Sequence, residues 1–451
     1  MLERLSNLRH AGRMLAALPR EARFPFRPRA EIEARRDARL RETIRLACRA
    51  VPYYRERMAA LGLTPEEFRS IDDLARLPVT PIDDLRDAPR EFLSARVNPD
   101  RCQLLRSGGT TGNEKWVWHD PASLLMNVAF SERQEFVIAR FVGHRLRQRQ
   151  LVINSTSSVS STVRAAYRRR LALLRPLGPR RVRIGIMEPF MDQVAALNRL
   201  RPEVLITNGL FIGDFYERLQ RAGLAPHRPR VIVAGAETLP ADQRRRIEHD
   251  FGVPVIMTYQ STESLKIGFE CEYRRGYHLH EDLCVVRLLD ADGRPVPPGA
   301  VGRIHITNLV NRATVLLNFD QGDTGRFLDE PCPCGRTLRR LELVGSRQWP
   351  LLRALDGRTL HGADVIRPVK EHTAVTRVQI LVERPDLWRV LYTDPRNETT
   401  AAWRRDTARR LERAVAGPGI TVRLEQRDQL ETTPAGKHSP VLIRCPQLPP
   451  Y

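Results

Sequence analysis

Lysine is almost missing from this chain of 451 residues. Only four of its 74 basic residues are lysine, and the other 70 are arginine. The formal net charge is +21, yet the arginines occur in every segment and no aromatic-basic module interrupts them. We attribute the charge to a general preference for arginine and expect no specific nucleic-acid partner. Each of the rare lysines therefore becomes informative where it stands beside other unusual residues.

Long apolar runs are also lacking. No segment reaches the roughly 18 apolar residues of a membrane span. Charged side chains interrupt residues 1–20, which therefore lack the uncharged core of a secretory signal. We expect a cytoplasmic protein without a membrane span. The sequence does not indicate an oligomeric state.

Cysteine is scarce and unevenly spaced. Seven cysteines, an odd number, are spread over a long chain, which argues against a disulfide framework. Reduced thiols or a metal site are the remaining interpretations.

A loop rich in glycine and threonine is the most informative stretch that is present. Its members are Ser107, Gly108, Gly109, Thr110, Thr111, Gly112, Asn113, Glu114 and Lys115. Glycine lets successive backbone N–H groups converge on an anion, hydroxyl groups add donors, and lysine supplies a mobile charge. This pattern predicts a phosphate-binding loop, with an ordinary turn as the alternative. It is not a Walker loop, because no Ser or Thr follows the lysine to hold magnesium.

The order of elements predicts an α/β fold. A helical start (1–100) precedes an α/β core (101–283), in which β-rich runs alternate with helical stretches such as 123–142. This alternation predicts a layered domain with a largely parallel sheet, whose ligands gather at the carboxyl ends of the strands. A smaller β element (284–344) follows, with strands expected at 284–289, 303–307 and 314–319. A compact α+β domain (345–451) ends the chain, with a boundary near Gly345.

Four further motifs follow the loop in a fixed order. They are Gly235-Ala236-Glu237 after a β-rich run, Tyr259-Gln260-Ser261-Thr262-Glu263, Phe319-Asp320-Gln321-Gly322-Asp323, and Pro434-Ala435-Gly436-Lys437. Together with the loop, they resemble the motifs of the acyl-adenylate-forming (ANL) superfamily. The resemblance implies a large amino-terminal domain and a small, mobile carboxy-terminal domain.

The resemblance also implies a role for each motif residue. Lys115 and its loop would hold the β- and γ-phosphates of ATP, and Thr262 would touch the α-phosphate. Glu263 would bind Mg²⁺. Residues 235–237 and Tyr259 would contact adenine, and Asp323 would accept the ribose hydroxyls. Lys437 would bridge the carboxylate and the α-phosphate, so the catalytic set is Lys437, Thr262 and Glu263. Taken singly, Glu263 could be a helix-terminal acid, Asp323 a turn former and Lys437 a solvated charge.

Within this superfamily the chain resembles the phenylacetate–CoA ligase family over residues 40–345. The matching segments are Pro52-Tyr53-Tyr54-Arg55, Leu77-Pro78-Val79, Glu270-Cys271-Glu272, Gly276-Tyr277-His278 and Cys332-Pro333-Cys334-Gly335-Arg336. The resemblance implies activation of a small, aromatic carboxylic acid by ATP and Mg²⁺, followed by transfer to coenzyme A. Residues 123–162 and 204–216 would line the acyl pocket.

The cysteines within these segments suggest a metal site. Cys271, His278, Cys332 and Cys334 offer three thiolates and one imidazole, which is a donor set for tetrahedral Zn²⁺. His280 could replace His278, and buried free thiols are the alternative. With four protein ligands the role would be structural.

Two segments depart from the family pattern. Asn318 to Gln321 stand where the ribose motif usually has other residues, and the hinge reads Gly345-Ser346-Arg347-Gln348-Trp349 without its usual carboxylate. The second half-reaction is therefore open. One alternative is an adenylate-forming ligase that passes its acyl group to an amine, a hydroxyl or a carrier-protein thiol. Another, of a different class, is a non-catalytic nucleotide-binding or regulatory protein with a basic surface.

Overall fold

The computed structural model describes most of the chain. The described residues are 2–107, 115–154, 159–170, 179–186, 188–345, 351–353, 359–361, 365–366, 368–369, 371–372, 374–375, 377–384, 386–394, 397–415, 421–428, 430–431 and 441–445. No helix within these ranges is both long and apolar enough to cross a membrane.

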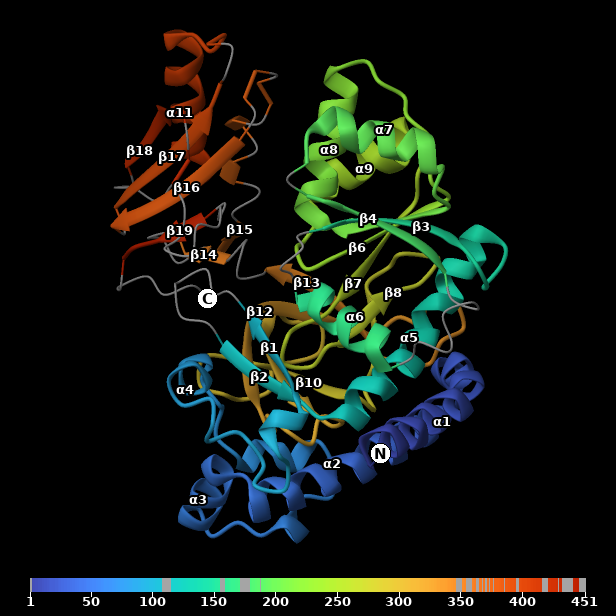
Figure 1. Cartoon of the computed structure of the whole chain (residues 1–451). Helices are drawn as coiled ribbons and strands as arrows, with labels where there is room; N and C mark the ends of the chain where they lie inside the picture. The colour runs from blue at the N-terminus through green and yellow to red at the C-terminus, as the bar shows by residue number, and fades with distance from the viewer. Residues whose placement is uncertain are drawn as a thin grey trace.

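The chain begins with helices, as predicted. They are α1 (Leu2–Arg23), η1 (Phe24–Phe26), α2 (Arg29–Ala50), α3 (Pro52–Ala60), η2 (Pro65–Glu67), η3 (Asp72–Arg76), α4 (Ile82–Asp87) and η4 (Pro99–Arg101). Figure 1 places them at the base of the molecule, in blue. They lie beneath the hairpin β1 (Gln103–Ser107) and β2 (Lys115–His119).

The core alternates strands and helices. Its elements are α5 (Pro121–Val142), β3 (Arg149–Asn154), α6 (Val159–Arg170), β4 (Arg180–Gly185), α7 (Phe190–Leu200), β5 (Val204–Asn208), α8 (Gly209–Arg221), β6 (Val231–Gly235), α9 (Ala241–Asp250) and β7 (Val255–Tyr259). The strands β3 to β7 pair in parallel, in the order β4-β3-β5-β6-β7. In Figure 1, α7, α8 and α9 cover one face of this sheet, and α5 and α6 lie on the other. The predicted layered α/β fold is confirmed.

Local sequence explains where these elements begin and end. The Asp120 carboxylate accepts hydrogen bonds from the backbone N–H groups of Ala122 and Ser123, and Pro121 occupies the first turn of α5. The helix stops at Gly143, whose φ of 90° is a left-handed conformation that glycine adopts without steric cost. The sequence thus fixes both ends of the predicted helix.

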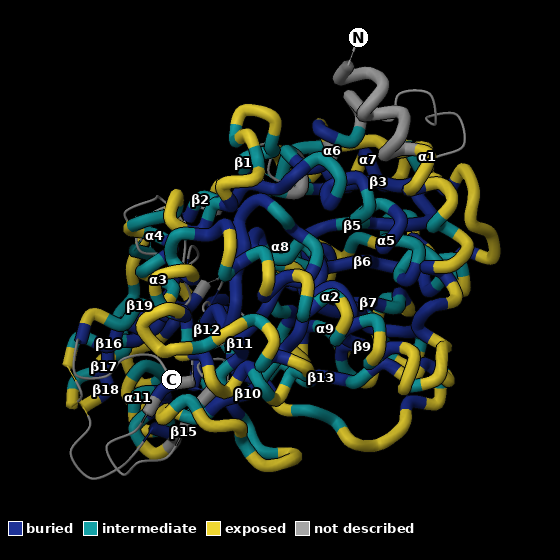
Figure 2. Tube along the Cα trace, turned by 90° about the horizontal axis from the view of Figure 1, so that it is seen from below, coloured by how far each residue is buried: buried dark blue, intermediate teal, exposed yellow. Residues whose placement is uncertain are grey.

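The antiparallel part continues the same sheet. Its strands are β8 (Gly268–Glu270), β9 (Tyr277–Leu279), β10 (Cys284–Leu289), β11 (Gly302–Asn308), β12 (Phe319–Leu328) and β13 (Arg340–Gly345). β7 pairs with β8, so an 11-stranded sheet runs from β10 to β4. The β element therefore shares one hydrogen-bonded sheet with the parallel core. In Figure 2 the strands β5, β6 and β7 lie in the buried centre of the molecule.

One predicted strand is wrong. Residues 314–318 form no strand, and β12 begins only at Phe319. Asn318 has a φ of 45°, and its side-chain amide donates to the carbonyl oxygens of Leu74 and Leu77. The Thr80 hydroxyl also donates to the Leu317 carbonyl at 2.7 Å. These contacts with the amino-terminal region replace strand pairing for residues 314–318.

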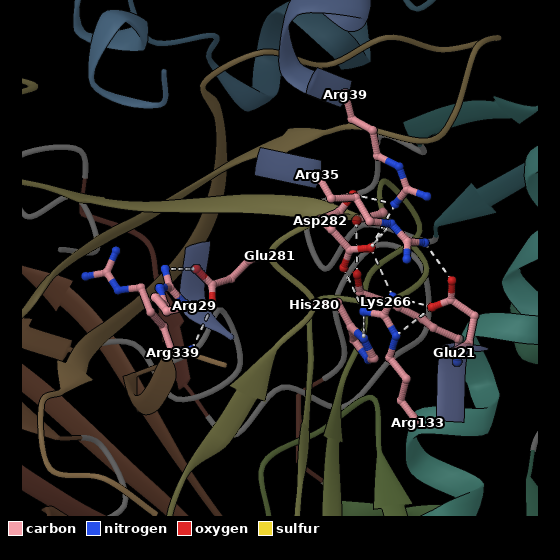
Figure 3. A network of polar contacts seen from close by, with 11 residues as sticks. Glu21, Arg29, Arg35, Arg39, Arg133, Lys266, His280, Glu281, Asp282 and Arg339 are labelled. Atoms are coloured by element: carbon pink, nitrogen blue, oxygen red, sulfur yellow. Dashed lines mark hydrogen bonds and ion pairs between the residues drawn. The ribbon is translucent and has the colours of Figure 1, made fainter. Parts of the chain in front are cut away.

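Many arginines serve internal pairing rather than an external surface. The fully buried Arg133 on α5 donates to Asp282 at 2.7 and 3.0 Å, and its Nε donates to Glu21 at 3.0 Å. Arg35 and Arg39 on α2 also pair with Asp282. Figure 3 shows this network joining α1, α2 and α5 to the turn after β9.

The last part of the chain has its own sheet. Its elements are β14 (Leu351–Arg353), β15 (Thr359–His361), β16 (Arg377–Arg384), β17 (Leu387–Thr393), α11 (Ala401–Val415), β18 (Thr421–Gln426) and β19 (Val441–Ile443). Four strands pair in the order β18-β17-β16-β19, and Trp388 and Leu411 lie in a separate apolar core. The predicted α+β arrangement of this part is confirmed.

Candidate active site

The β1–β2 hairpin frames the glycine-threonine loop. Ser107 closes β1 and pairs with Lys115, the first residue of β2. Residues 108–114, which include Gly108, Gly109, Thr110, Thr111 and Gly112, lie outside the described residues, as does the Ser107 side chain. The paired strands β1 and β2 therefore flank the glycine-threonine loop on both sides.

Lys115 and Glu263 form a buried ion pair. The Lys115 ammonium contacts the Glu263 carboxylate, and the two residues are only 2% and 1% exposed. The ammonium also lies 5.7 Å from the centre of the Phe319 ring. A Lys and a Glu that stand 148 positions apart in the sequence are thus in direct contact. The Lys115 ammonium is thus a cation held directly beside the Glu263 carboxylate.

The residues predicted to contact adenine form a tight turn at the carboxyl edge of the parallel sheet. Gly235 ends β6 opposite Asn208, which ends β5. Ala236 has a φ of 63°, and a Cβ atom on Gly209 at the start of α8 would lie 2.1 Å from the Glu237 carbonyl oxygen. The turn therefore packs directly against the amino terminus of α8, as only glycine permits.

Tyr259 and Asp323 meet beside this edge. The Tyr259 hydroxyl, at the end of β7, donates to Asp323 Oδ2 at 2.7 Å. β12 bulges at this point, because its register against β11 shifts between the pairs His305–Asp320 and Arg303–Thr324. Gly322 has a φ of 74°, and its N–H donates to Asp320 Oδ1. A β-bulge changes the direction in which a side chain points, and here the Asp323 side chain points toward Tyr259.

Two side chains absent from the predicted site hold the Thr262–Glu263 segment. His119 Nε2 lies 2.8 Å from the Thr262 carbonyl oxygen, and Asn308 Nδ2 donates to the Glu263 carbonyl at 2.8 Å. Burial lowers the pKa of His119, which favours the neutral ring. The sequence offered one weak signal for His119, a polar residue at the end of a buried strand.

Residues of the amino-terminal region also support the site, among them two tyrosines that marked the family resemblance. Tyr54 Oη accepts a hydrogen bond from the Leu317 N–H at 2.8 Å, and Thr80 N donates to the Asn318 carbonyl. These contacts hold the chain that enters β12 and leads to Asp323. The Tyr53 hydroxyl donates to Asp84 on α4.

Only part of the predicted site falls within the described residues. Lys437 and the motif 434–437 lie outside the described residues, and so do residues 346–349 of the hinge. Of the segments predicted to line the acyl pocket, α5 and α6 contact each other through Asn127 Nδ2, which donates to Tyr167 Oη at 2.7 Å. Phe211 and Phe215 lie on α8, within the second of these segments, and their rings stack with centres 5.8 Å apart.

The four predicted metal ligands come together. The ligand atoms of Cys271, His278, Cys332 and Cys334 all lie within 4.8 Å of one another. The Cys271 and Cys332 sulfurs are 3.6 Å apart, and the Cys334 sulfur is 3.3 Å from His278 Nε2. His280 instead faces Arg133, at 3.4 Å. His278 rather than His280 is therefore the fourth member of the cluster.

Hydrogen bonds favour a thiolate within this cluster. The Cys271 thiol lowers the pKa of Cys334, and His278 and the Arg336 N–H contribute in the same direction. Hydrogen bonding to Cys334 conversely raises the pKa of Cys271, and burial adds to that rise.

The solved structures that resemble this chain are acyl-adenylate-forming ligases. A 2-hydroxyisobutyryl-CoA ligase bound to an acyl adenylate gives a TM-score of 0.72 at 17% identity, covering 93% of this chain and 91% of its own. The o-succinylbenzoate CoA synthetase of Bacillus subtilis, with its acyl-adenylate intermediate, gives 0.53 at 16% identity, covering 75% and 67%. The fold is that of this superfamily, as the motifs implied.

The sequence itself is similar to phenylacetate–coenzyme A ligases, which confirms the resemblance to that family. The enzyme of Thermus thermophilus is 28% identical over 336 residues, covering 72% of each chain. That of Escherichia coli is 24% identical over 336 residues, covering 71% of this chain and 72% of its own. No protein-family model matches the chain.

Proposed function

We propose that this protein uses ATP and Mg²⁺ to convert a carboxylic acid into an acyl adenylate, and then transfers the acyl group to coenzyme A. One observation carries the proposal. The Lys115–Glu263 pair and the Tyr259–Asp323 pair draw residues from three separate segments to the carboxyl edge of the parallel sheet. Ligands of parallel α/β sheets bind at this edge.

The charges suit this chemistry. An anionic carboxylate must attack an anionic α-phosphate, so cations and N–H donors around both groups lower the barrier. Lys115 would hold the β- and γ-phosphates together with its loop, and Thr262 would contact the α-phosphate. Asp323 would accept the ribose hydroxyls while Tyr259 packs on adenine.

The Glu263 carboxylate fits Mg²⁺, because it is a hard oxygen donor and the metal would replace the Lys115 ammonium as its cationic partner. Bound Mg²⁺ would neutralise phosphate charge. Lys437 would bring a second ammonium to the reacting carboxylate. An aromatic acid is the substrate class that we propose, on the similarity to phenylacetate–coenzyme A ligases.

Pyrophosphate exchange with a panel of acids tests the proposal. We expect exchange into ATP that depends on Mg²⁺ and on an aromatic acid such as phenylacetate, and consumption of coenzyme A with that acid. Adenylate trapped by hydroxylamine without consumption of coenzyme A would indicate an amine, a hydroxyl or a carrier-protein thiol as acceptor. ATP binding without exchange for any acid would contradict the enzymatic proposal.

We also propose a structural Zn²⁺ at Cys271, His278, Cys332 and Cys334. Tetrahedral Zn²⁺ separates two sulfur ligands by about 3.8 Å, and a sulfur from a nitrogen by about 3.6 Å. The distances of 3.6 and 3.3 Å in the cluster are close to these values. Such an ion would fasten the β8–β9 turn to the connection between β12 and β13.

Metal analysis tests the zinc site. We expect about one zinc per chain, loss of zinc in Cys334→Ser, and a lower melting temperature after chelation. Cys284→Ser is the matched control, because Cys284 is buried on β10 and outside the cluster. A folded, metal-free protein whose melting temperature does not respond to zinc would refute the site.

A further inference from the structure

The Thr262–Glu263 segment has little secondary structure of its own. It follows the end of β7 at Tyr259 and precedes β8 at Gly268, and Leu265 within this connection has a φ of 61°. A carboxylate on such a connection is precise only if other elements fix its main chain. The positions of the Thr262 and Glu263 carbonyl groups therefore decide where the Glu263 side chain points.

Both carbonyl groups accept a hydrogen bond from a buried side chain. His119, on β2, contacts the Thr262 carbonyl, and Asn308, at the end of β11, donates to the Glu263 carbonyl, each at 2.8 Å. His119 and Asn308 are both buried. Side chains from two different elements thus hold two consecutive peptide groups of this segment.

The orientation of Asn308 is fixed independently. Its Oδ1 accepts the N–H groups of Val310 and Asn311, each at 2.9 Å, so its Nδ2 is the atom that faces Glu263. His119 stands four positions after Lys115 on the same strand. Side chains alternate along a strand, so residues four positions apart lie on one face. β2 thus presents both the ammonium that contacts Glu263 and the imidazole that supports its main chain.

We infer that His119 and Asn308 are positioning residues, which hold the Thr262–Glu263 main chain so that the Glu263 carboxylate is set for Mg²⁺. The inference rests on the proposed function, because it assigns to Glu263 the magnesium of the adenylation reaction. Both side chains contact carbonyl groups of this segment rather than the Glu263 carboxylate. Groups that orient a metal ligand without touching the metal change metal affinity by about 10- to 100-fold when they are removed.

Metal binding and kinetics of His119 variants test this inference. In His119→Ala we expect the Mg²⁺ concentration for half-maximal exchange to rise about tenfold or more. The KM for the acid should change little. His119→Gln keeps an N–H donor and should restore most of the metal affinity, which a purely structural defect would not predict.

Two further variants keep the test decisive. Asn308→Asp is isosteric and keeps the acceptor for Val310 and Asn311, but it cannot donate to Glu263 when ionised, so it should also weaken metal binding. His227→Ala is the control, because His227 Nε2 makes the same kind of contact with a loop carbonyl, that of Pro202 at 3.0 Å, before β5. We expect its Mg²⁺ requirement to equal that of the wild type.

Mn²⁺ binding to the complex with a non-hydrolysable ATP analogue provides a readout that needs no turnover. A folded His119→Ala or Asn308→Asp protein with wild-type Mn²⁺ affinity would overturn the inference, as would an equal loss in His227→Ala. Wild-type protein that binds Mn²⁺ and the analogue but exchanges pyrophosphate with no acid would instead refute the proposed function.

Discussion

At the scale of single residues, the Lys115–Glu263 pair combines a structural and a proposed catalytic role. Both side chains are buried, so each neutralises a charge that the interior would otherwise disfavour. A bound nucleotide with Mg²⁺ would give each member of the pair a new partner. Phosphate would replace Glu263 as the partner of Lys115, and the metal would replace Lys115 as the partner of Glu263.

Removing one member of this pair should be costly. Lys115→Met leaves the Glu263 carboxylate buried without its ammonium, and we expect the free energy of unfolding to fall by about 3–5 kcal/mol. The double variant Lys115→Met/Glu263→Gln removes both charges and should recover most of this loss while remaining inactive. Urea unfolding followed by circular dichroism measures both effects. Equal stability of the single and double variants would contradict a direct coupling.

Buried histidines predict a loss of stability in mild acid. Burial lowers the pKa of both His119 and His305 below the usual value of 6.5. In the unfolded chain these rings take up protons as the pH falls through about 6.5, but in the folded chain they resist protonation. The unfolded state then binds more protons, so stability falls as the pH drops below this value.

Thermal unfolding between pH 7.5 and 5.5 measures this dependence. We expect the melting temperature to fall across this range, and to fall less steeply in His305→Gln than in the wild type. A melting temperature that stays constant from pH 7.5 to 5.5 would contradict the assignment of neutral buried rings.

At the scale of elements, the contact between α8 and the turn after β6 predicts a sharp effect of one methyl group. A Cβ atom at position 209 would overlap the Glu237 carbonyl oxygen. Gly209→Ala should therefore displace the turn 235–237, and raise the KM for ATP by roughly 10- to 100-fold. Gly12→Ala is the control, because a Cβ at Gly12 of α1 has no neighbour within 4 Å. Steady-state kinetics with varied ATP distinguishes the two variants, and an unchanged KM in Gly209→Ala would disprove the packing argument.

The periodicity of the sequence predicted those elements that are long enough to contain a repeat. The alternation of the strands β3 to β7 with helices such as α5 was expected from apolar runs and from their spacing. The strands β8, β9 and β19 have three residues each, too few for a period, and they form because long-range partners pair with them. Residues 314–318 have a β-rich composition but bind the amino-terminal region instead.

The site residues divide in the same way, into those that the sequence predicts and those that depend on long-range contacts. Lys115, Glu263, Tyr259 and Asp323 were predicted because motif order identifies residue types. His119 and Asn308 were not, because their contacts join segments that are far apart in the sequence, such as His119 and Thr262. The metal cluster lies between these cases, since donor types suggested it but only the fold selects His278 over His280.

At the scale of the whole molecule, the 11-stranded sheet and the four-stranded sheet belong to parts with separate cores, and α8 contacts the last part of the chain. Arg221 Nη2 donates to the Val375 carbonyl at 3.1 Å, and Leu210 packs against the core of the last part. We propose that the part beginning near Gly345 is the mobile domain, and that it delivers Lys437 to the nucleotide site. Such motion accompanies many multistep reactions.

Lys437→Ala tests this delivery. We expect adenylation to slow by about 100- to 1000-fold, because one cation at the developing charge is lost. ATP affinity should stay nearly intact, since Lys115 and the loop remain. Lys370→Ala, the other lysine of this part of the chain, serves as the control. Equal exchange rates for Lys437→Ala and the wild type would refute the role.

The continuity of the 11-stranded sheet also sets a rule for building chimeras with related ligases. Because β7 and β8 share backbone hydrogen bonds, a crossover between the parallel and antiparallel halves would require two foreign strands to match in register, twist and length. A crossover after Gly345, at the end of β13, breaks no pairing of that sheet. Recombination there would exchange the domain that carries Lys437 and leave the nucleotide edge intact, so acyl selection and acyl transfer could be inherited from different parents.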